Sequence, residues 1–286
     1  MKIKNPRFMM ISSMTIFGTL GIFVRNIPLS SGELALYRAV MAAIIIGGYL
    51  FISKQRIPWK EIKKEIPLLL FSGVAMGINW ILLFEAYTYT TVSIATLSYY
   101  FAPVIVTLVC PLLFREKLTA KQLLCFVMST LGIVLITGIG NLSGNKDLIG
   151  ILCGLGAAVF YATVILLNKF IKRVEGIHRT FLQFLAAIAV LIPYVIFSGG
   201  NNIVGMEPVG WINLLTVGIL HTGITYCMYF SSLKDLPGQK AAILSYIDPL
   251  VAVIISVTLL GEPMTVMQVV GGVLILGFTL LNELSA

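Results

Sequence analysis

Ten apolar segments, each about 20 residues long and so able to cross the hydrocarbon core of a bilayer, succeed one another along the chain. They lie near residues 8–25, 32–52, 67–88, 92–114, 120–140, 148–168, 180–198, 209–231, 239–260 and 266–284. Of the 286 residues, 58% are hydrophobic and 11% are charged, with a mean hydropathy of +0.97. Because a water-soluble fold cannot bury this much apolar side chain, the sequence predicts an all-α integral membrane protein with ten transmembrane helices.

The segments between the apolar stretches are short and leave no room for a soluble catalytic domain. The sequence contains no G-x-x-x-x-G-K-[S/T] phosphate loop and no G-x-S-x-G or H-E-x-x-H motif. Its four cysteines lie within apolar segments and show no C-x-x-C spacing. We therefore expect a protein that is not an enzyme, that hydrolyses no nucleotide, and that holds no metal or other cofactor.

Residues 91–137 and 237–282 carry the same pattern at a constant spacing of 146 residues. The repeated pairs are Tyr100 and Tyr246, Pro103 and Pro249, Leu113 and Leu259, Glu116 and Glu262, Thr119 and Thr265, and Gln122 and Gln268. Because each copy holds five spans, an odd number, the second copy has to lie upside down relative to the first. We predict two inverted five-helix repeats, residues 1–140 and 147–286, which is the architecture of many secondary transporters.

The basic residues are distributed asymmetrically between the two sides that ten spans would create. Seventeen of the 20 precede the first span or lie in the second, fourth, sixth or eighth loop. Arg25 and Lys146 lie in opposite loops, and Arg38 lies inside a span. This pattern places both termini in the cytoplasm of a cell-membrane protein. The net charge of +8 is therefore explained by the membrane surface, and we expect no nucleic-acid partner.

Two short segments, 114–119 and 260–265, each close one apolar span and open the next. Thr119 and Thr265 begin T-x-x-Q patterns that fit the helix capping box, in which a hydroxyl and an amide satisfy the first backbone amides. Together with the upstream prolines, the duplicated Pro…Glu-x-x-Thr pattern resembles the EamA-type branch of the drug/metabolite transporter superfamily. The resemblance implies ten helices in two inverted halves, and export of small metabolites such as amino acids or amphipathic compounds.

Charged residues near span ends have structural explanations. Glu116 and Glu262 each precede a helix start, where a negative charge is favourable, and we interpret them mainly as residues that fix turns. Ser30 and Glu33 form another capping-box pattern at the start of the second span. Arg38, about one turn deeper, has three possible roles: it extends outward to the interface, pairs with an acid such as Glu33 or Glu85, or binds a substrate carboxylate.

Pro103 and Pro249 predict kinks in the fourth and ninth spans, because proline deprives the carbonyl four residues earlier of its usual amide. Such a defect at membrane depth is tolerated where protein or a water-filled cavity satisfies it. Tyr99, Tyr100 and Tyr246 lie just before these prolines. We therefore predict that the two spans line the transport pathway, with ordinary helix packing as the alternative.

Asp248 and His221 are the two candidates for coupling transport to protons. Asp248 lies within an apolar span and has Ala102 as its counterpart in the first half. It is a protonatable coupling group, a partner for a cationic substrate, or a hydrogen-bonded lock on the Pro249 kink. His221 lies near the centre of the eighth span. Imidazole titrates near neutrality, but a neutral histidine bonded to a neighbouring helix is equally consistent with this position.

Aromatic residues deep within the spans predict a site for a flat or apolar solute with a polar group. Trp80 in the third span, Tyr161 in the sixth and Tyr226 in the eighth are the candidates for substrate contact. The leading hypothesis is an alternating-access exporter of small organic solutes, either proton-coupled or not, that acts as a monomer or homodimer. An importer or passive facilitator of the same fold is the alternative, and an intramembrane enzyme is a remote one.

Overall fold

The computed structural model describes residues 5–54, 57, 59–114, 119–137, 145–174, 176–199, 203–235 and 244–284. Over these residues the chain is all-helical and contains no strand. In the first half the helices are α1 (Pro6–Gly18), α2 (Leu20–Val24), α3 (Ser31–Ile52), α4 (Trp59–Ile62), α5 (Ile66–Tyr89), α6 (Val92–Tyr99), α7 (Ala102–Phe114) and α8 (Ala120–Thr137). In the second half they are α9 (Asn145–Phe170), α10 (Gly176–Phe197), α11 (Pro208–Leu215), the π-helix η1 (Thr216–Ile224), α12 (Thr225–Asp235), α14 (Ile247–Thr258) and α15 (Val266–Glu283).

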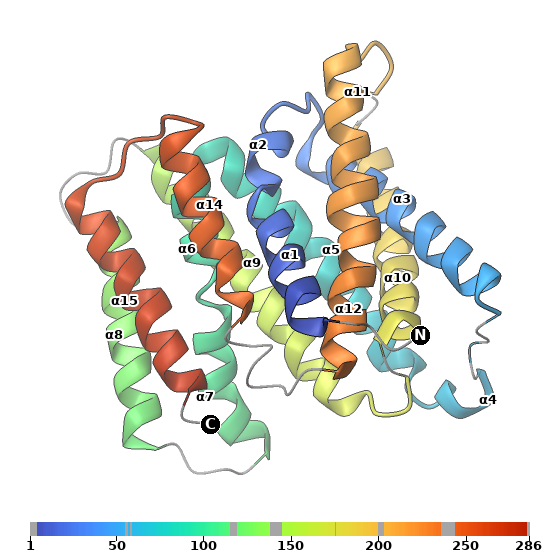
Figure 1. The fold of residues 1–286 in the computed structure, drawn as a ribbon, viewed down its shortest axis with the longest axis horizontal. Coiled ribbons are helices and arrows are strands. Elements are labelled where there is room, and N and C mark those ends of the chain that lie inside the picture. The colour runs from blue at the N-terminus through green and yellow to red at the C-terminus, as the bar shows by residue number, and fades with distance from the viewer. Residues whose placement is uncertain are drawn as a thin grey trace.

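The helices of the described residues coincide with the ten predicted spans. Six stretches are long and apolar enough to cross a membrane: 6–24, 31–52, 66–89, 146–168, 176–197 and 208–229. Four shorter apolar helices cover 92–106, 123–135, 247–258 and 266–281, where the other four spans were predicted. The first helix begins and the last helix ends toward the lower side of the bundle as drawn (Figure 1), as an even number of crossings requires.

Each main contact between helices has a counterpart in which the two halves exchange roles. Helix α1 packs on α12 and α14, while α9, the first helix of the second half, packs on α5 and α7. Likewise α3 packs on η1, and α10 packs on α5. Other contacts join α3 with α10, and α8 with α15, which form a pair at the edge of the bundle (Figure 1), while α6 packs on α14 between the fourth and ninth spans.

Glycines allow the closest of these helix contacts. A Cβ atom added at Gly73 of α5 would lie 2.4 Å from the Cβ of Ala186 in α10, and one added at Gly218 of η1 would lie 2.3 Å from Met41 in α3. Neither position has room for a larger side chain, so the backbones approach as small residues permit in membrane helices. Gly73 thus packs within the chain, against α10.

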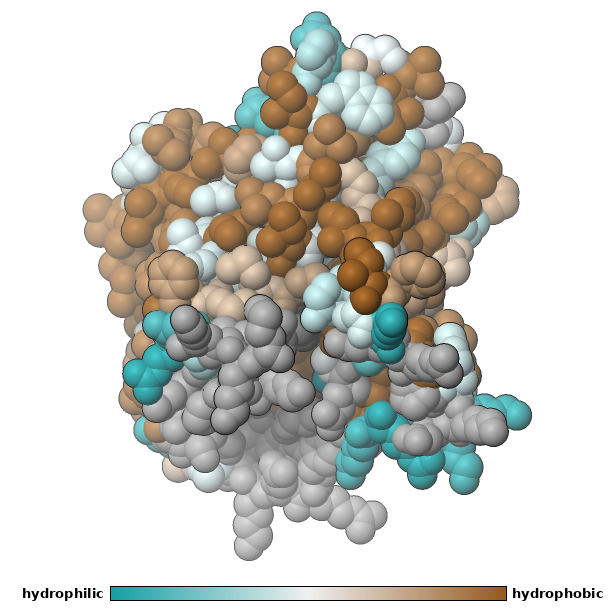
Figure 2. Space-filling view, turned by 45° about the vertical axis from the view of Figure 1, so that its right-hand side comes forward, coloured by the Kyte–Doolittle hydropathy of each residue, from teal (hydrophilic) through white to brown (hydrophobic). Residues whose placement is uncertain are grey.

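The outer surface is apolar over a broad band, with exposed side chains such as Ile44, Phe71 and Val273. Apolar side chains cover most of the upper and middle part of the face in Figure 2, whereas hydrophilic ones gather at its lower margin and its upper tip. Such a surface is the reverse of that of a soluble protein and suits contact with lipid. Together with the six long spans, it makes the chain a multi-span membrane protein.

Two of the spans are broken inside the bundle. Helix α6 ends at Tyr99 and α7 begins at Ala102, while the ninth span is interrupted at Tyr246, before α14 begins. Pro103 and Pro249 therefore lie in the first turn of the second helical piece, where a missing N–H costs little, and not within a continuous helix. The breaks occur where kinks were predicted, and they bring Tyr100 and Tyr246 to the interruption in each span.

Candidate functional site

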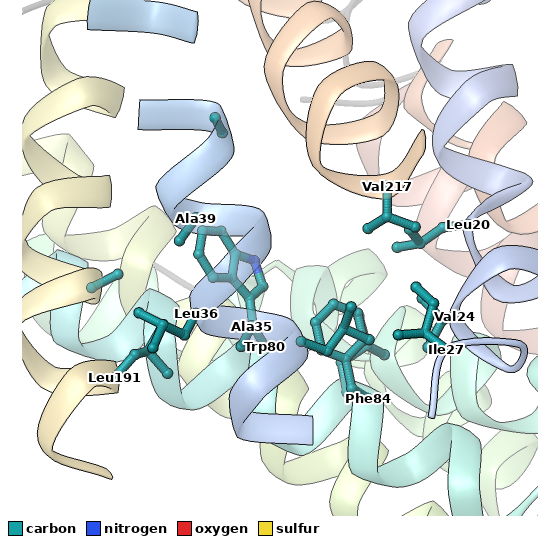
Figure 3. Packing of buried hydrophobic residues seen from close by; sticks show 14 of the residues in the cluster. Leu20, Val24, Ile27, Ala35, Leu36, Ala39, Trp80, Phe84, Leu191 and Val217 are labelled. Carbon is teal, nitrogen blue, oxygen red and sulfur yellow. The ribbon is translucent and has the colours of Figure 1, made fainter. Parts of the chain in front are cut away.

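Arg38 is the most deeply buried cation of the described residues, with 3% of its surface exposed. It lies about two turns into α3. Its guanidinium carbon lies 4.8 Å from the ring centre of Trp80 and 5.1 Å from that of Phe84, both in α5. Ala35 and Ala39 leave space on α3 against which the Trp80 ring lies (Figure 3). The two aromatic faces therefore hold the guanidinium from α5.

The Nε–H of Arg38 donates to Oγ1 of Thr222 at 3.1 Å. Thr222 lies in η1, and its own hydroxyl donates to the carbonyl of Val217, five residues earlier, at 2.8 Å. A π-helix has this five-residue spacing, and π-helical turns recur at functional sites. The irregular helix thus places a second-half hydroxyl beside a first-half guanidinium.

Arg38 forms no ion pair with an acid of the described residues. No carboxylate of the described residues lies within 4.0 Å of its nitrogens. Glu33 instead accepts from the N–H and hydroxyl of Ser30, completing the predicted capping box, and Glu85 accepts from Ser31. An unpaired buried charge costs several kcal/mol, and cation–π contacts return only about 0.5–2 kcal/mol each. The ligand-free charge is thus only partly compensated.

Asp248, in the first turn of α14, accepts a hydrogen bond from the hydroxyl of Tyr100 at 2.7 Å. The same hydroxyl lies 3.5 Å from the carbonyl oxygen of Ser245, the carbonyl whose amide partner Pro249 removes. Tyr100 belongs to the first half and Asp248 to the second. The contact therefore joins the two broken spans at their interruptions, and the predicted carboxylate and tyrosine lie together.

Four further tyrosines lie around Asp248. Tyr99 stacks on Tyr161 of α9 with ring centres 5.2 Å apart, and Tyr246 lies 6.5 Å from Tyr100. Tyr226 of α12 lies edge-to-face with Phe17 of α1, with ring centres 5.1 Å apart. Of these side chains only Tyr246 is fully buried; Tyr99, Tyr100, Tyr161, Tyr226 and Asp248 itself keep part of their surface accessible. Both halves contribute to this partly accessible group, which we call the tyrosine cluster (Tyr99, Tyr100, Tyr161, Tyr226 and Tyr246).

Trp80 and Tyr226 are linked through Phe184 of α10. The ring centre of Phe184 lies 5.2 Å from that of Trp80 and 5.4 Å from that of Tyr226, in edge-to-face geometry. Trp80 is buried, with 4% of its surface exposed, whereas Tyr226 is half-buried. The predicted aromatic residues therefore form two groups: Trp80 and Tyr226, joined through Phe184 beside Arg38, and Tyr161, which stacks on Tyr99 beside Tyr100.

His221 lies apart from the tyrosine cluster and is buried on η1, with 1% exposed. Its Nε2 lies 2.8 Å from the hydroxyl of Thr19, and its Nδ1 lies 3.2 Å from the carbonyl oxygen of Thr216. The Thr19 hydroxyl also lies 2.7 Å from the carbonyl oxygen of Ile16. Rotation of this hydroxyl lets it donate to neutral His221, or accept from the imidazolium while donating to Ile16. The geometry accommodates both protonation states.

Glu262 is 7% exposed and bonds to the other half of the chain, not only within its own turn. Its Oε2 accepts from the backbone N–H of Val92, at the start of α6, at 2.9 Å, and it also accepts from the hydroxyl of Ser256. Arg25 pairs with the same carboxylate and donates to the carbonyl of Thr90 at 2.8 Å. We call Arg25, Thr90, Val92, Ser256 and Glu262 the end cluster, because it lies at the end of the bundle away from the lower side on which the chain begins and ends (Figure 1).

The remaining predicted turn residues differ in how far the structure describes them. Thr265 and Gln268 form both hydrogen bonds of a capping box, at 2.8 and 3.2 Å. Thr119 precedes α8 and its carbonyl accepts from Leu123. Glu116 lies outside the described residues.

Two polar residues of this region were not singled out from the sequence for the contacts they make. Neither Thr222 nor Thr19 was among the residues that the sequence indicated as candidates. Their partners lie 184 and 202 residues away, respectively. Only the packing of η1 against α2 and α3 brings these groups together.

Comparison with known proteins places the whole chain in one family. The model of the EamA-like transporter family matches residues 6–138 and again residues 148–283. The uncharacterized transporter YxxF of Bacillus subtilis (strain 168) is 33% identical over 268 residues, which cover 93% of this chain and 85% of YxxF. An uncharacterized transporter of Archaeoglobus fulgidus is 26% identical over 273 residues, covering 94% and 93% of the two chains.

One solved crystal structure matches the fold with a TM-score of 0.67 at 16% identity, covering 98% of this chain and 97% of the other. At that identity the match supports the fold alone. The family model, by contrast, covers both halves, and the 33% identity with YxxF extends over nearly the full chain. The protein therefore belongs to the EamA-like transporter family.

Proposed function

We propose that the protein is a secondary carrier that exports small organic metabolites, either amino acids or amphipathic aromatic compounds, across the cell membrane by alternating access. The observation that carries this proposal is the tyrosine cluster around Asp248. Side chains from both halves surround a carboxylate that remains partly accessible within an apolar bundle. An intramembrane acid in such surroundings is a functional group by default, and a solute held there contacts both halves at once.

The proposal includes two inverted repeats, residues 1–140 and 147–286, and cytoplasmic termini. It is supported by the exchanged helix contacts, in which α1 with α12 corresponds to α9 with α5, and by the two matches of the family model. Two equivalent halves around a central site can open to each side in turn. With cytoplasmic termini, the end cluster lies on the external side.

The end cluster is the contact that has to break for the external side to open. It joins the turn before α15 to the start of α6 through Glu262, and to the end of α2 through Arg25. These interactions are few and polar, so a modest free-energy change separates the closed and open ends.

Asp248 is the proposed coupling group, and His221 is the second candidate. Tyr100 donates a hydrogen bond to Asp248. An ammonium group of the solute, or a proton, would compete with Tyr100 for the same carboxylate. The Thr19 hydroxyl lets His221 accept or release a proton without loss of a hydrogen bond. Proton coupling of transport follows if one of these groups changes protonation between the two open states.

Reconstitution of the purified protein in proteoliposomes tests the proposal. A panel of radiolabelled amino acids, polyamines, nucleosides and aromatic cations is measured for uptake and efflux, with and without a pH gradient. A carrier moves one class saturably, and a coupled one accumulates it against a gradient. Unsaturable flux supports a passive facilitator, and gradient-driven accumulation on the cytoplasmic side supports an importer. Absence of flux for every class contradicts the proposal.

A further inference from the structure

Arg38 has donors that the protein itself does not use. A guanidinium carries five N–H donors, and only the Nε–H of Arg38 has a hydrogen-bond acceptor among the described residues, the hydroxyl of Thr222. The guanidinium carbon lies over the rings of Trp80 and Phe84, and the N–H groups of the two terminal nitrogens have no acceptor among the described residues. The unused donors are therefore the N–H groups of the two terminal nitrogens. Arginine can donate two parallel hydrogen bonds from these nitrogens to one carboxylate.

The acids of the chain that are nearest in sequence or in the central region are engaged elsewhere. Glu33 caps α3 through Ser30, and Glu85 accepts from Ser31. Asp248 accepts from Tyr100 and forms no ion pair with Arg38 within 4.0 Å. The protein thus keeps a cation in its apolar interior and directs these carboxylates away from it.

We propose that Arg38 binds the carboxylate of the transported solute, so that the protein carries organic acids or zwitterions and not neutral or purely cationic compounds. This inference rests on the proposed transport function and names the solute class for the same central region. The fork of arginine matches a carboxylate, and the flanking Trp80 and Phe84 rings offer apolar surface to the adjoining part of the solute. Phe184, whose ring lies between those of Trp80 and Tyr226, connects this point to Tyr226 of the tyrosine cluster.

Binding to the full-length protein in detergent tests the assignment directly. The probes are four carboxylates, namely L-leucine, L-phenylalanine, phenylacetate and 2-oxoisocaproate, each paired with its amide. We expect at least one acid, and not its amide, to raise the melting temperature and to bind in equilibrium dialysis. Arg38→Gln should weaken this binding roughly 30-fold or more, as expected for loss of a buried charge pair, and Arg38→Lys should weaken it less.

Arg7→Gln is the matched control, because Arg7 is an exposed arginine of α1, and it should leave binding unchanged. Equal binding of acid and amide, equal binding to Arg38→Gln and the parent protein, or binding of none of the four acids would each overturn the assignment. If the acids bind in detergent but proteoliposomes move none of them, the transport proposal fails and the assignment stands. If Arg38→Gln proteoliposomes move a solute at the parental rate, the assignment fails and transport stands.

A second measurement needs no ligand. Arg38→Met replaces the cation by an apolar side chain of similar length, which suits a site whose charge has no partner in the protein. We expect the melting temperature of the ligand-free protein to rise or to stay the same, and the stabilisation by the acid to disappear. A large fall in the melting temperature of correctly folded Arg38→Met would show that Arg38 holds the fold together, and would contradict the proposal.

Discussion

Arg25 and Arg38 are both arginines of the first half, yet their surroundings are opposite. Arg25 is partly exposed, with 34% of its side chain accessible, and it pairs with Glu262 and with the carbonyl of Thr90. Arg38 is almost completely buried and has two aromatic rings and one hydroxyl as partners. The partly exposed Arg25 therefore has an acidic partner, whereas the buried Arg38, which has lost most of its contact with water, has none.

If both arginines only stabilised the fold, the buried one would be expected to have the acidic partner, because a buried cation needs a counter-charge more than an exposed one does. The difference teaches that the two arginines serve different purposes. Arg25 holds the two halves together at one end, through an ion pair that is weakened by its exposure to water. Arg38 keeps donors available at the centre, where a solute completes its pairing. The four predictions below test this contrast, in order of decreasing effect.

The largest effect is expected for Arg38→Gln in proteoliposomes. Removing the charge takes away the anchor of the solute, so we expect transport to fall by roughly 100-fold, equivalent to about 3 kcal/mol. Initial rates over a range of solute concentrations measure it. Arg25→Gln, which removes an arginine of the other kind, should lower the rate far less. Similar losses in both variants would erase the contrast.

Asp248→Asn is expected to have the next largest effect. The amide keeps the shape and still accepts from Tyr100, but it cannot bind or release a proton and attracts a cation weakly. We expect pH-driven accumulation to fall about 10-fold or more, while exchange of labelled for unlabelled solute continues. His221→Ala, measured in parallel, separates the two coupling candidates. Undiminished accumulation in both variants would exclude them as coupling groups.

Glu262→Gln should lower the free energy needed to open the end cluster by about 1–2 kcal/mol, because it removes the ion pair with Arg25 but keeps an acceptor for the N–H of Val92. Ser93, fully buried beside the cluster and bonded through its N–H to Ser256, provides a reporter position. In a background without the native cysteines, Ser93→Cys should react several-fold faster with a membrane-impermeant maleimide when Glu262→Gln is added. Glu207→Gln, at the exposed start of α11, is the control. No change in labelling would argue against opening at this end.

The smallest effect is expected for Tyr100→Phe. It removes one hydroxyl from Asp248 and from the Ser245 carbonyl, at a cost of about 1 kcal/mol. We expect a change of a few-fold in the affinity for the solute and little change in the melting temperature. Titration of solute binding to the purified variant measures it. A loss as large as that of Arg38→Gln would move the principal binding contact from Arg38 to the tyrosine cluster.

Much of the architecture could be predicted from the sequence, because it depends on local chemistry. Ten apolar stretches of sufficient length predicted the helices, and the proline positions predicted where the fourth and ninth spans break. The capping boxes at Ser30 and Thr265 followed from residue type and spacing alone. These features need no knowledge of which helices are neighbours.

The contacts of the candidate site could not be predicted in the same way, because they join distant segments. Glu262 reaches the N–H of Val92, 170 residues away, where the sequence suggested a charge for its own turn. Arg38 had three possible roles, and only the positions of Glu33 and Glu85, which bond elsewhere, remove pairing with an acid. The π-helical register that presents Thr222 to Arg38 has no sequence signature.

Counterflow in proteoliposomes tests the central claim most directly. Vesicles are loaded with the unlabelled acid that most stabilises the purified protein, and a trace of the labelled acid is added outside. A carrier whose halves close alternately on a solute at Arg38 predicts a transient accumulation of label above equilibrium, retained in Arg7→Gln and lost in Arg38→Gln. Label that only equilibrates, or an overshoot that Arg38→Gln leaves intact, would contradict the account.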